Sequence, residues 1–363
     1  MIDLLLKENL TVDDVLLVPK FGELRSRSDA ELHPFIYSAP MDTVTGYDLA
    51  VALNRAGHIP VVSRALENEW LTSVVEAHEG KLIFLAMGPG DDSMRMLEAT
   101  AHNVPGAKLA VAIDIAHGHS VVGKELVQKH LELPQVVEIM SGSVCTAEAA
   151  IDCIEWGCTH LRIGVGPGSL CTTRRMCGVG FPQLSAVHRI YEAIKPYRPK
   201  YPVTLIADGG IRYPGDAVAY LAAGADAIML GREFSRCEES AGWVEEPVYR
   251  DAVSTTSGGV EMAMRFKTGT KRVKRYRGQA SHSFQMDNGK SGQFVEGETG
   301  PEITPQGTVQ DVVNRYEAGV RSALSYLGLT SIHDLKPENV EFIRQTTSGY
   351  IEGSPHGLDS SRG

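Results

Sequence analysis

Short apolar runs with the composition of β-strands recur along the first two-thirds of the chain. Each is followed by a turn and then by a helical pattern. Their nearly continuous apolar character is typical of strands that are buried on both faces of a parallel sheet. The eight runs are Phe35–Ala39, Ile59–Val62, Leu82–Ala86, Leu109–Ile113, Val136–Met140, His160–Gly164, Val203–Ala207 and Ala227–Leu230.

Helical patterns lie between these runs, for example over Ala147–Trp156, Pro182–Ile194 and Gly215–Ala223. Alternation of strand and helix predicts a parallel sheet with right-handed crossovers. Eight such units within about 200 residues favour a closed (β/α)8 TIM barrel, of class α/β, over the alternative of an open doubly wound sheet. In a barrel the turns after the strands share one rim, where such proteins keep their chemistry.

We expect a single barrel domain over residues 1–345. Residues 250–307 are rich in Gly, Lys and Ser and weakly periodic, which predicts a mobile flap or loop insert within that domain. Residues 308–327 return to an amphipathic helical pattern, and residues 346–363 are predicted to form a flexible C-terminal tail.

Composition excludes several classes of function. The chain of 363 residues has 35 Lys and Arg against 45 Asp and Glu, a net charge of −10. It therefore lacks the basic field that neutralises nucleic-acid phosphates. No apolar run approaches the roughly 20 residues of a membrane span, and the N-terminus lacks a signal-peptide pattern. We expect a cytoplasmic protein that binds small molecules, and neither nucleic acid nor membrane.

The most informative stretch is GVGPGSLCTTR at 164–174, directly after the sixth predicted strand. Its glycines and proline predict a rigid turn that a ligand approaches closely. The Ser169 hydroxyl is a candidate phosphate donor. Cys171 is followed by Thr173 and Arg174, and nearby cationic charge favours the reactive thiolate. The alternative is a tight turn with a buried cysteine. We interpret the other five cysteines as small buried apolar residues.

Two further stretches follow strand ends. IADGGIR at 206–212 and the later Gly231-Arg232 come after the seventh and eighth strands, where barrels bind phosphate through backbone N–H groups. Asp208 there is a candidate acceptor for ribose hydroxyls, and the alternative is an ordinary glycine turn with a capping Asp. In IDIAHGHS at 113–120, Asp114 could hold a second ribose. His117 and His119 have no evident third partner, which disfavours a metal site.

A basic run over Arg265–Arg277 contains seven Lys and Arg residues in thirteen. A solvated charged face is the favoured interpretation of such a run. Its end, however, passes directly from Tyr276 into Gly278 and Gln279, which suggests that this end closes over a phosphate.

On these motifs the chain resembles the IMP dehydrogenase / GMP reductase family over nearly its whole length. The resemblance implies a (β/α)8 barrel, usually a homotetramer, that binds a purine nucleotide (GMP or IMP) while Cys171 attacks C2 of the base. The motifs are SAPMDTV at 38–44, IDIAHGHS at 113–120, GVGPGSLCTTR at 164–174, GVGFPQ at 178–183, IADGGIR at 206–212 and YRGQAS at 276–281.

By motif, Cys171 resembles the nucleophile that forms the nucleotide adduct, and Thr173 resembles the threonine that assists proton transfer. Glu296 resembles a flap glutamate of one reductase branch that works with that threonine to protonate departing ammonia, and Glu298 is the alternative for this role. The substrate-binding positions implied are Ser169, Asp208, Gly209, Gly210, Gly231, Arg232, Tyr276, Gly278 and Gln279. The nicotinamide-cofactor positions implied are Asp114, Ala116, His117, Gly164 and Gly166. Backbone carbonyls of Gly164, Gly166 and Cys171 match those that hold K⁺ in the dehydrogenases.

Two features favour the reductase branch. His282-Ser283 stand where the dehydrogenases carry a water-activating Arg-Tyr pair, and no regulatory insert follows Arg64. We therefore expect a GMP reductase that converts GMP to IMP and ammonia with NADPH. The alternative is an IMP dehydrogenase that uses NAD and a substitute base such as His282, and MDTVT, YRGQAS and residues 353–357 favour it. A nucleotide-binding regulator without catalysis is a further alternative. Ser143 and Arg232 fit neither branch.

Overall fold

The computed structural model describes residues 8–65, 68–78, 80–255, 261–289, 292 and 294–353. Within them, eight parallel strands form one sheet in the order β2-β9-β8-β7-β6-β5-β4-β3. All eight predicted runs contribute a strand, and each lies at or within about four residues of its predicted position. The strands are β2 (Ile36–Ser38), β3 (Val61–Val62), β4 (Phe84–Met87), β5 (Leu109–Ile113), β6 (Val136–Val144), β7 (His160–Ile163), β8 (Thr204–Asp208) and β9 (Ala227–Leu230).

The sheet closes on itself between its first and last strands. Tyr37 of β2 pairs in parallel with Ile59, just before β3. The Ile59 amide donates to the Ile36 carbonyl at 3.0 Å, and the Ser38 amide donates to the Ile59 carbonyl at 3.2 Å. The predicted (β/α)8 barrel is therefore confirmed, and the open sheet is excluded.

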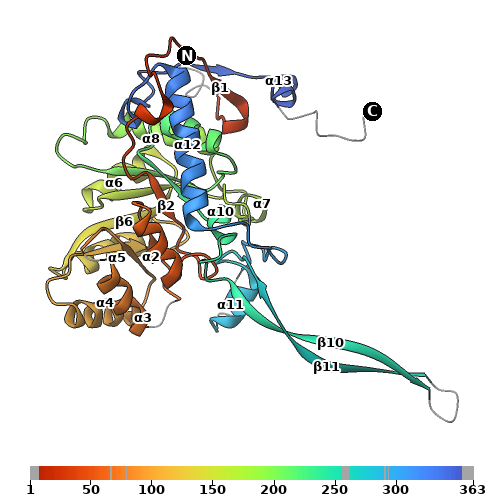
Figure 1. Cartoon of the computed structure of the whole chain (residues 1–363). Coiled ribbons are helices and arrows are strands. Elements are labelled where there is room, and N and C mark those ends of the chain that lie inside the picture. Colours follow the sequence, from red (N-terminus) through yellow and green to blue (C-terminus); the bar gives the residue numbers. More distant parts are fainter. Residues whose placement is uncertain are drawn as a thin grey trace, which may run out of the picture.

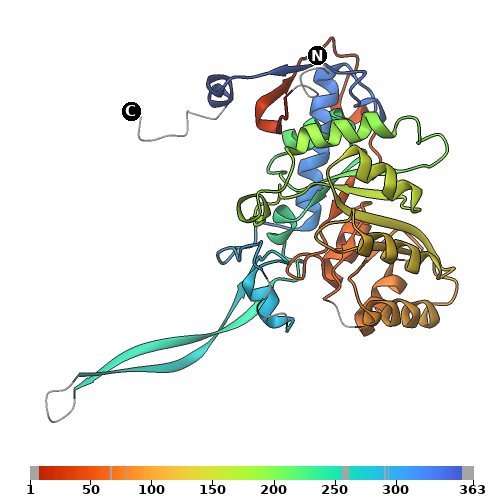
Figure 2. The ribbon, with the colours of Figure 1, turned by 180° about the vertical axis from the view of Figure 1, so that it is seen from behind.

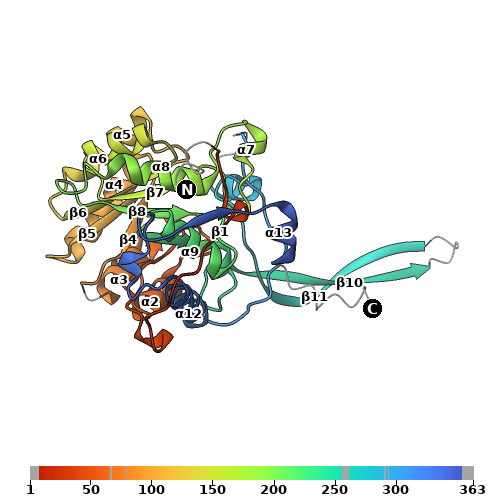
Figure 3. The ribbon, with the colours of Figure 1, turned by 90° about the horizontal axis from the view of Figure 1, so that it is seen from above.

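Helices surround this barrel (Figures 1 and 3). The last one, α12 (Val309–Leu327), contacts both α9 and α2 and so completes the ring. Its N-terminus is fixed by a capping box between Thr308 and Asp311, and it ends at the left-handed Gly328. The other surrounding helices are α2 (Tyr47–Arg55), α3 (Asn68–Ala77), α4 (Asp91–Asn103), α5 (Val121–Leu131), α6 (Ala147–Glu155), α8 (Gln183–Ile194) and α9 (Pro214–Ala222).

Apolar side chains form two packed layers. Inward-facing residues of the strands, among them Tyr37, Phe84, Met140 and Met229, fill the barrel interior. A larger cluster lies between the outside of the barrel and the helices. The interior is thus a packed core and not a channel, so ligands are confined to the rims. No helix in the described part of the chain is long and apolar enough to cross a membrane.

The connection between β9 and α12 carries the largest insertion. It begins with α10 (Arg232–Ser235) and continues as an antiparallel hairpin of β10 (Trp243–Thr255) and β11 (Glu261–Lys274). This hairpin extends well away from the barrel (Figures 1 and 2). The hairpin lies where we predicted a loop that begins at residue 250. Charged cross-strand pairs such as Glu245 with Arg272 and Glu246 with Lys271 account for the weak apolar periodicity of this part of the sequence.

Short elements at both ends of the chain lie together beside the barrel. β1 (Val15–Leu17), which follows η1 (Val12–Asp14), pairs antiparallel with β12 (Phe342–Arg344). η2 (Arg27–Asp29) and η3 (Ile332–Asp334) flank these strands in the sequence. The predicted tail begins with a short helix, α13 (Thr347–Glu352), whereas its residues 354–363 lie outside the described residues.

Candidate active site

The functional residues gather at the carboxyl ends of the barrel strands, where two adjoining cavities open. The first, of about 560 Å³, is lined by Cys171 and its neighbours together with residues from the ends of β2, β5, β7 and β8. The second, of about 340 Å³, extends from it toward the ends of β8 and β9. Ser169, Asp208, Gly209 and Tyr276 line both, so the two cavities form one continuous site.

A glycine with positive φ and a hydrogen bond from an arginine side chain fix the shape of the loop after β7. Gly164 has φ +144°, and a Cβ there would lie 2.5 Å from the Asp208 carbonyl oxygen. Arg174 donates from Nε to the Val165 carbonyl at 2.9 Å. It thereby ties the end of the loop to its beginning. This guanidinium braces the backbone, a role different from the thiolate activation that its sequence position suggests.

Three side chains are linked by polar contacts at the mouth of the first cavity. The exposed Cys171 thiol lies 3.2 Å from the Thr173 hydroxyl, and that hydroxyl donates to Glu296 Oε2 at 3.1 Å. Thr173 is the first residue of the one-turn helix α7 (Thr173–Met176). A nucleophile beside a hydroxyl that is bonded to a carboxylate can move protons to or from a reacting group.

Backbone pairing brings the flap glutamate to this position. The Thr172 amide donates to the Glu296 carbonyl at 2.9 Å, and the Glu298 amide donates to the Leu170 carbonyl at 2.9 Å. Residues 296–298 therefore run antiparallel to the cysteine loop, with Gly297 opposite Cys171. Glu296 lines the cavity, whereas Glu298 is exposed and is not among the lining residues.

The predicted phosphate-binding residues come together in the second cavity. Gly210, Gly231, Arg232 and Tyr276 line it, and the Ser169 hydroxyl lies 3.3 Å from the Tyr276 hydroxyl. Burial raises the pKa of Tyr276, so this phenol stays a neutral hydrogen-bond donor. Hydroxyl donors and glycine backbone around one cavity suit a phosphate ligand.

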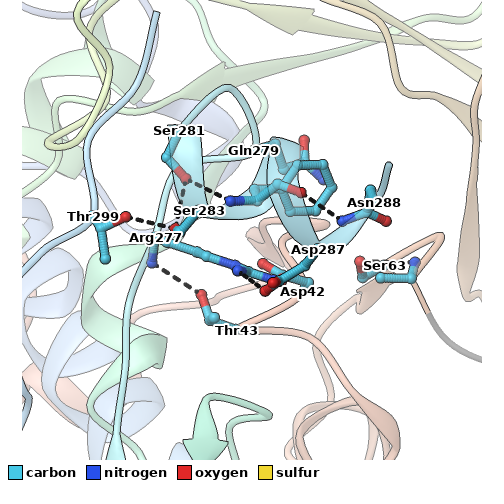
Figure 4. A network of polar contacts seen from close by, with 12 residues as sticks. Asp42, Thr43, Ser63, Arg277, Gln279, Ser281, Ser283, Asp287, Asn288 and Thr299 are labelled. Carbon is cyan, nitrogen blue, oxygen red and sulfur yellow. Dashed lines mark hydrogen bonds and ion pairs between the residues drawn. The ribbon is translucent and has the colours of Figure 1, made fainter. Parts of the chain in front are cut away.

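Of the end of the basic run, Tyr276 lines this cavity and Arg277 does not. Arg277 turns away and donates to Asp42 Oδ2 from Nε at 2.8 Å and from Nη2 at 2.5 Å. Figure 4 shows this pair together with the polar contacts around it. Gly278 and Gln279, the predicted residues that follow, line the Cys171 cavity instead.

A buried chain of ions crosses the wall of the first cavity. Arg162, on β7, donates to Asp208 Oδ2 at 3.2 Å and lies 3.8 Å from Asp114, which also pairs with Arg64 at 3.0 Å. Burial raises the pKa of Asp208, and the Arg162 charge opposes that rise. Arg162 was not among the predicted site residues, although a lone cation inside an apolar strand, as in HLRI at 160–163, is a pattern that could have identified it.

The structure divides the predicted cofactor positions. Asp114, Ala116, Gly164 and Gly166 line the Cys171 cavity, but His117 is exposed and is not among the lining residues. The Asp114 carboxylate pairs with Arg64 at 3.0 Å, a partner that the sequence did not indicate.

The histidines near the rim are not among the residues that line the two cavities. His119 pairs with Asp152 at 2.8 Å, and no cluster of three His, Cys, Asp or Glu side chains suited to a metal occurs among the described residues. His282 is the exposed first residue of α11 (His282–Asp287) and does not line the cavity.

Comparison with known proteins gives a consistent assignment. A family model described as "IMP dehydrogenase / GMP reductase domain" matches residues 9–356. An inosine-5'-monophosphate dehydrogenase of Borreliella burgdorferi is 30% identical, over 98% of this chain and 98% of its own length. Proteins of the same name from Chlorobaculum tepidum and Aquifex aeolicus are 36% and 34% identical over 68% and 76% of this chain. The chain spans about half the length of these last two, 47% and 52%.

Proposed function

The chain belongs to the IMP dehydrogenase / GMP reductase family, and on that premise we propose that it oxidises IMP to XMP with NAD. The observation that carries this proposal is the chain of contacts from Cys171 through Thr173 to Glu296 at the mouth of the cavity. A purine C2 placed at the sulfur lies within reach of both a nucleophile and a base.

The residues have distinct roles in this reaction. The Cys171 thiolate forms a bond to C2 of IMP. The nicotinamide cofactor, when bound, supplies the acceptor for the hydride that leaves C2. Glu296 then takes a proton from the Thr173 hydroxyl while that hydroxyl takes one from water. The water oxygen bonds to C2, the C2–S bond breaks, and its electron pair returns to the sulfur.

Nucleotide binding follows from the second cavity. The hydroxyls of Ser169 and Tyr276 and the backbone of Gly210 and Gly231 would hold the 5'-phosphate, with Arg232 adding positive charge. Asp208, whose Oδ2 already accepts from Arg162, would accept from ribose hydroxyls, and Gly209, Gly278 and Gln279 complete the wall beside it.

The first cavity also fits a nicotinamide cofactor. Its volume of about 560 Å³ lies within the range of ligand pockets. Arg162 Nη1, which is buried at its edge, has no hydrogen-bond partner among the described residues. A polar ligand would satisfy this donor. Asp114, Ala116, Gly164 and Gly166 would lie along that ligand.

Two observations favour the dehydrogenase over the reductase that the sequence led us to expect. The similar proteins carry the dehydrogenase name, and the one from Borreliella burgdorferi matches over almost the full length of both chains, so a chain without a regulatory insert is compatible with that activity. In addition, the Thr173–Glu296 pair would provide a water-activating base, which answers the objection that His282-Ser283 replace the Arg-Tyr pair.

GMP reductase is the second candidate, because the same three residues could serve it. The missing Arg-Tyr pair favours a reaction that needs no hydrolysis. In that reaction Glu296 and Thr173 would protonate the ammonia that leaves C2, and NADPH would be the reductant. A regulator without catalysis is disfavoured, since the nucleophile and its proton relay are assembled.

The two candidates are separated by two incubations followed at the nicotinamide absorbance band. IMP with NAD should give XMP and reduced cofactor, while GMP with NADPH should give no ammonia. Formation of IMP and ammonia from GMP, without XMP formation from IMP, would overturn the dehydrogenase assignment.

We also propose K⁺ binding at the carbonyls of Gly164, Gly166 and Cys171 and a homotetrameric assembly, both on the resemblance to the family. Replacing K⁺ by Na⁺ in the IMP assay and measuring the mass of the assembly by light scattering test these two points. Full activity in Na⁺, or a monomer in solution, would contradict them.

A further inference from the structure

Arg277 joins the barrel to the flap through a two-sided ion pair. Its Nε and Nη2 contact Asp42 Oδ2, in the turn after β2, at 2.8 and 2.5 Å, and its Nη1 contacts Asp287 Oδ2, at the end of α11, at 2.5 Å (Figure 4). Its side chain is only 16% exposed. The guanidinium also lies over the Phe284 ring at 5.4 Å. We call the Asp42–Arg277–Asp287 group the clasp.

Two further bonds fix the same stretch of chain to the turn after β2. The Arg277 amide donates to the Thr43 hydroxyl at 3.3 Å, and Gln279 Nε2 donates to the Pro40 carbonyl at 2.5 Å. Residues 277–279 are therefore attached to residues 40–43 at three points. That turn belongs to the barrel, so it is a rigid reference for whatever the stretch supports.

The stretch supports the catalytic segment of the flap directly. The Gly278 amide donates to the Glu298 carbonyl at 3.0 Å, and the Glu296 amide donates to the Ala280 carbonyl at 3.2 Å. Residues 296–298 thus lie between residues 278–280 on one side and the Cys171 loop on the other. Displacement of residues 278–280 would therefore displace Glu296 from Thr173.

We propose that Arg277 is a positioning residue whose clasp on Asp42 and Asp287 sets Glu296 at the Thr173 hydroxyl. This inference rests on the proposed function. Because Glu296 acts after the hydride has left C2, the clasp is required for hydrolysis of the adduct and not for hydride loss. Arg277 touches neither cavity, so it exerts this effect only through the backbone layer that it anchors.

The chemistry of the clasp requires arginine. A guanidinium presents several donors in a fixed fork and reaches both carboxylates at once, whereas a lysine ammonium is a single point charge on a flexible stem. Asp42 Oδ1 is buried and has no hydrogen-bond partner among the described residues. The pairing of Oδ2 with Arg277 is therefore what offsets the burial of this carboxylate.

Rapid-mixing kinetics with IMP and NAD test the proposal on Arg277→Lys and Asp287→Asn, with Arg275→Lys as the matched control. Arg275 is two residues away and pairs with Glu246 at the base of the hairpin. Misplacement of a catalytic group by about 1 Å costs about 10²-fold in rate. For Arg277→Lys we expect a fast burst of about one reduced cofactor per subunit, followed by turnover about 10- to 100-fold slower than wild type.

Asp287→Asn removes an exposed partner and should slow turnover about threefold with the burst retained, while Arg275→Lys should match wild type. Equal loss of burst and turnover in Arg277→Lys, or no change in either, overturns the proposal. If Arg277→Lys does not fold, as judged by circular dichroism, Asp287→Asn decides, and unchanged turnover in it is the overturning result.

Hydrogen exchange separates failure of this inference from failure of the proposed function. The Glu296 amide donates to the Ala280 carbonyl and the Gly278 amide donates to the Glu298 carbonyl, so both amides report on the layer that Arg277 anchors. Their exchange should accelerate in Arg277→Lys and not in Arg275→Lys, whatever reaction the protein catalyses. Unchanged exchange at both amides contradicts the clasp, while accelerated exchange in a protein that makes no XMP contradicts only the assigned reaction.

Discussion

Replacement of Glu296 by glutamine isolates the proton-transfer step. The two side chains have nearly the same size, and the glutamine amide oxygen can still accept from the Thr173 hydroxyl, which lies 3.1 Å from Oε2. It cannot take up a proton. The substitution therefore preserves the geometry and removes only the base.

The expected loss follows from this difference. General acid–base catalysis contributes about 10²–10⁴-fold, or about 2.7–5.4 kcal/mol of barrier. Glu296 belongs to the Cys171 cavity and not to the one that would hold the phosphate. We therefore expect steady-state turnover to fall by about 10²–10⁴-fold while the Kd for IMP changes by less than about threefold.

Two measurements on each variant check this expectation. Titration calorimetry gives the Kd for IMP, and quenched-flow analysis separates the burst of reduced cofactor from the release of XMP. Glu298→Gln is the matched control, since Glu298 is two residues away, has the same side chain and is exposed outside the cavity. It should keep the turnover of the wild type.

Full turnover in Glu296→Gln would refute the role of this residue. Loss of turnover in Glu298→Gln with normal turnover in Glu296→Gln would move the role to Glu298, and with it the register that we assign to the flap. Loss of the burst along with turnover would show that Glu296 acts before hydride transfer.

Three other predictions follow from single groups. Cys171→Ala should abolish turnover, below about 10⁻³ of wild type, while nucleotide still binds by calorimetry; measurable multiple turnovers would refute the covalent route. Asp226→Ala should destabilise the fold by about 3 kcal/mol in urea titration, since Asp226 pairs with Arg198 and Lys336, and a loss under about 1 kcal/mol contradicts it. Burial lowers the pKa of His160 to about 4. The unfolded chain, with pKa near 6.5, therefore binds the extra proton first, and stability falls as the pH drops from about 6.5 to 4. Replacement of His160 by Gln should reduce that slope by up to about 1.4 kcal/mol per pH unit, and an unchanged slope would contradict the assignment.

The barrel could be predicted from the sequence because the signals for its strands and helices are local. Each strand is a short apolar run, and each helix has its own period, so alternation alone identifies the architecture. The loop after β7, which we propose to be catalytic, was predictable for the same reason. Its glycines, Ser169 and Cys171 lie within eleven consecutive residues of one motif, GVGPGSLCTTR.

Features that depend on distant partners were missed. The sequence places Asp114 and Asp208 at strand ends but does not show that Arg162 lies between them or that Arg64 occupies the Asp114 carboxylate. The direction of Arg277 was misjudged because its partners, Asp42 and Asp287, lie in other segments. A strand that carries several like charges can be mistaken for a phosphate-binding face, because the acidic side chains that pair with it lie elsewhere in the sequence.

The flap illustrates this limit most clearly. Thr173 and Glu296 are 123 residues apart in the sequence, and two glutamates, at 296 and 298, lie on the same face of one extended segment. Only the register decides between them, because Gly297 opposite Cys171 places one glutamate beside Thr172 and the other beside Leu170. A Cβ at 297 would lie 3.2 Å from the backbone at Ala280 and Ser281. A glycine at this position therefore lets residues 278–280 pack closely against the flap segment. The choice of the proposed base therefore depends on the packing of three segments, one of which is residues 278–280, the layer that we propose the clasp to anchor.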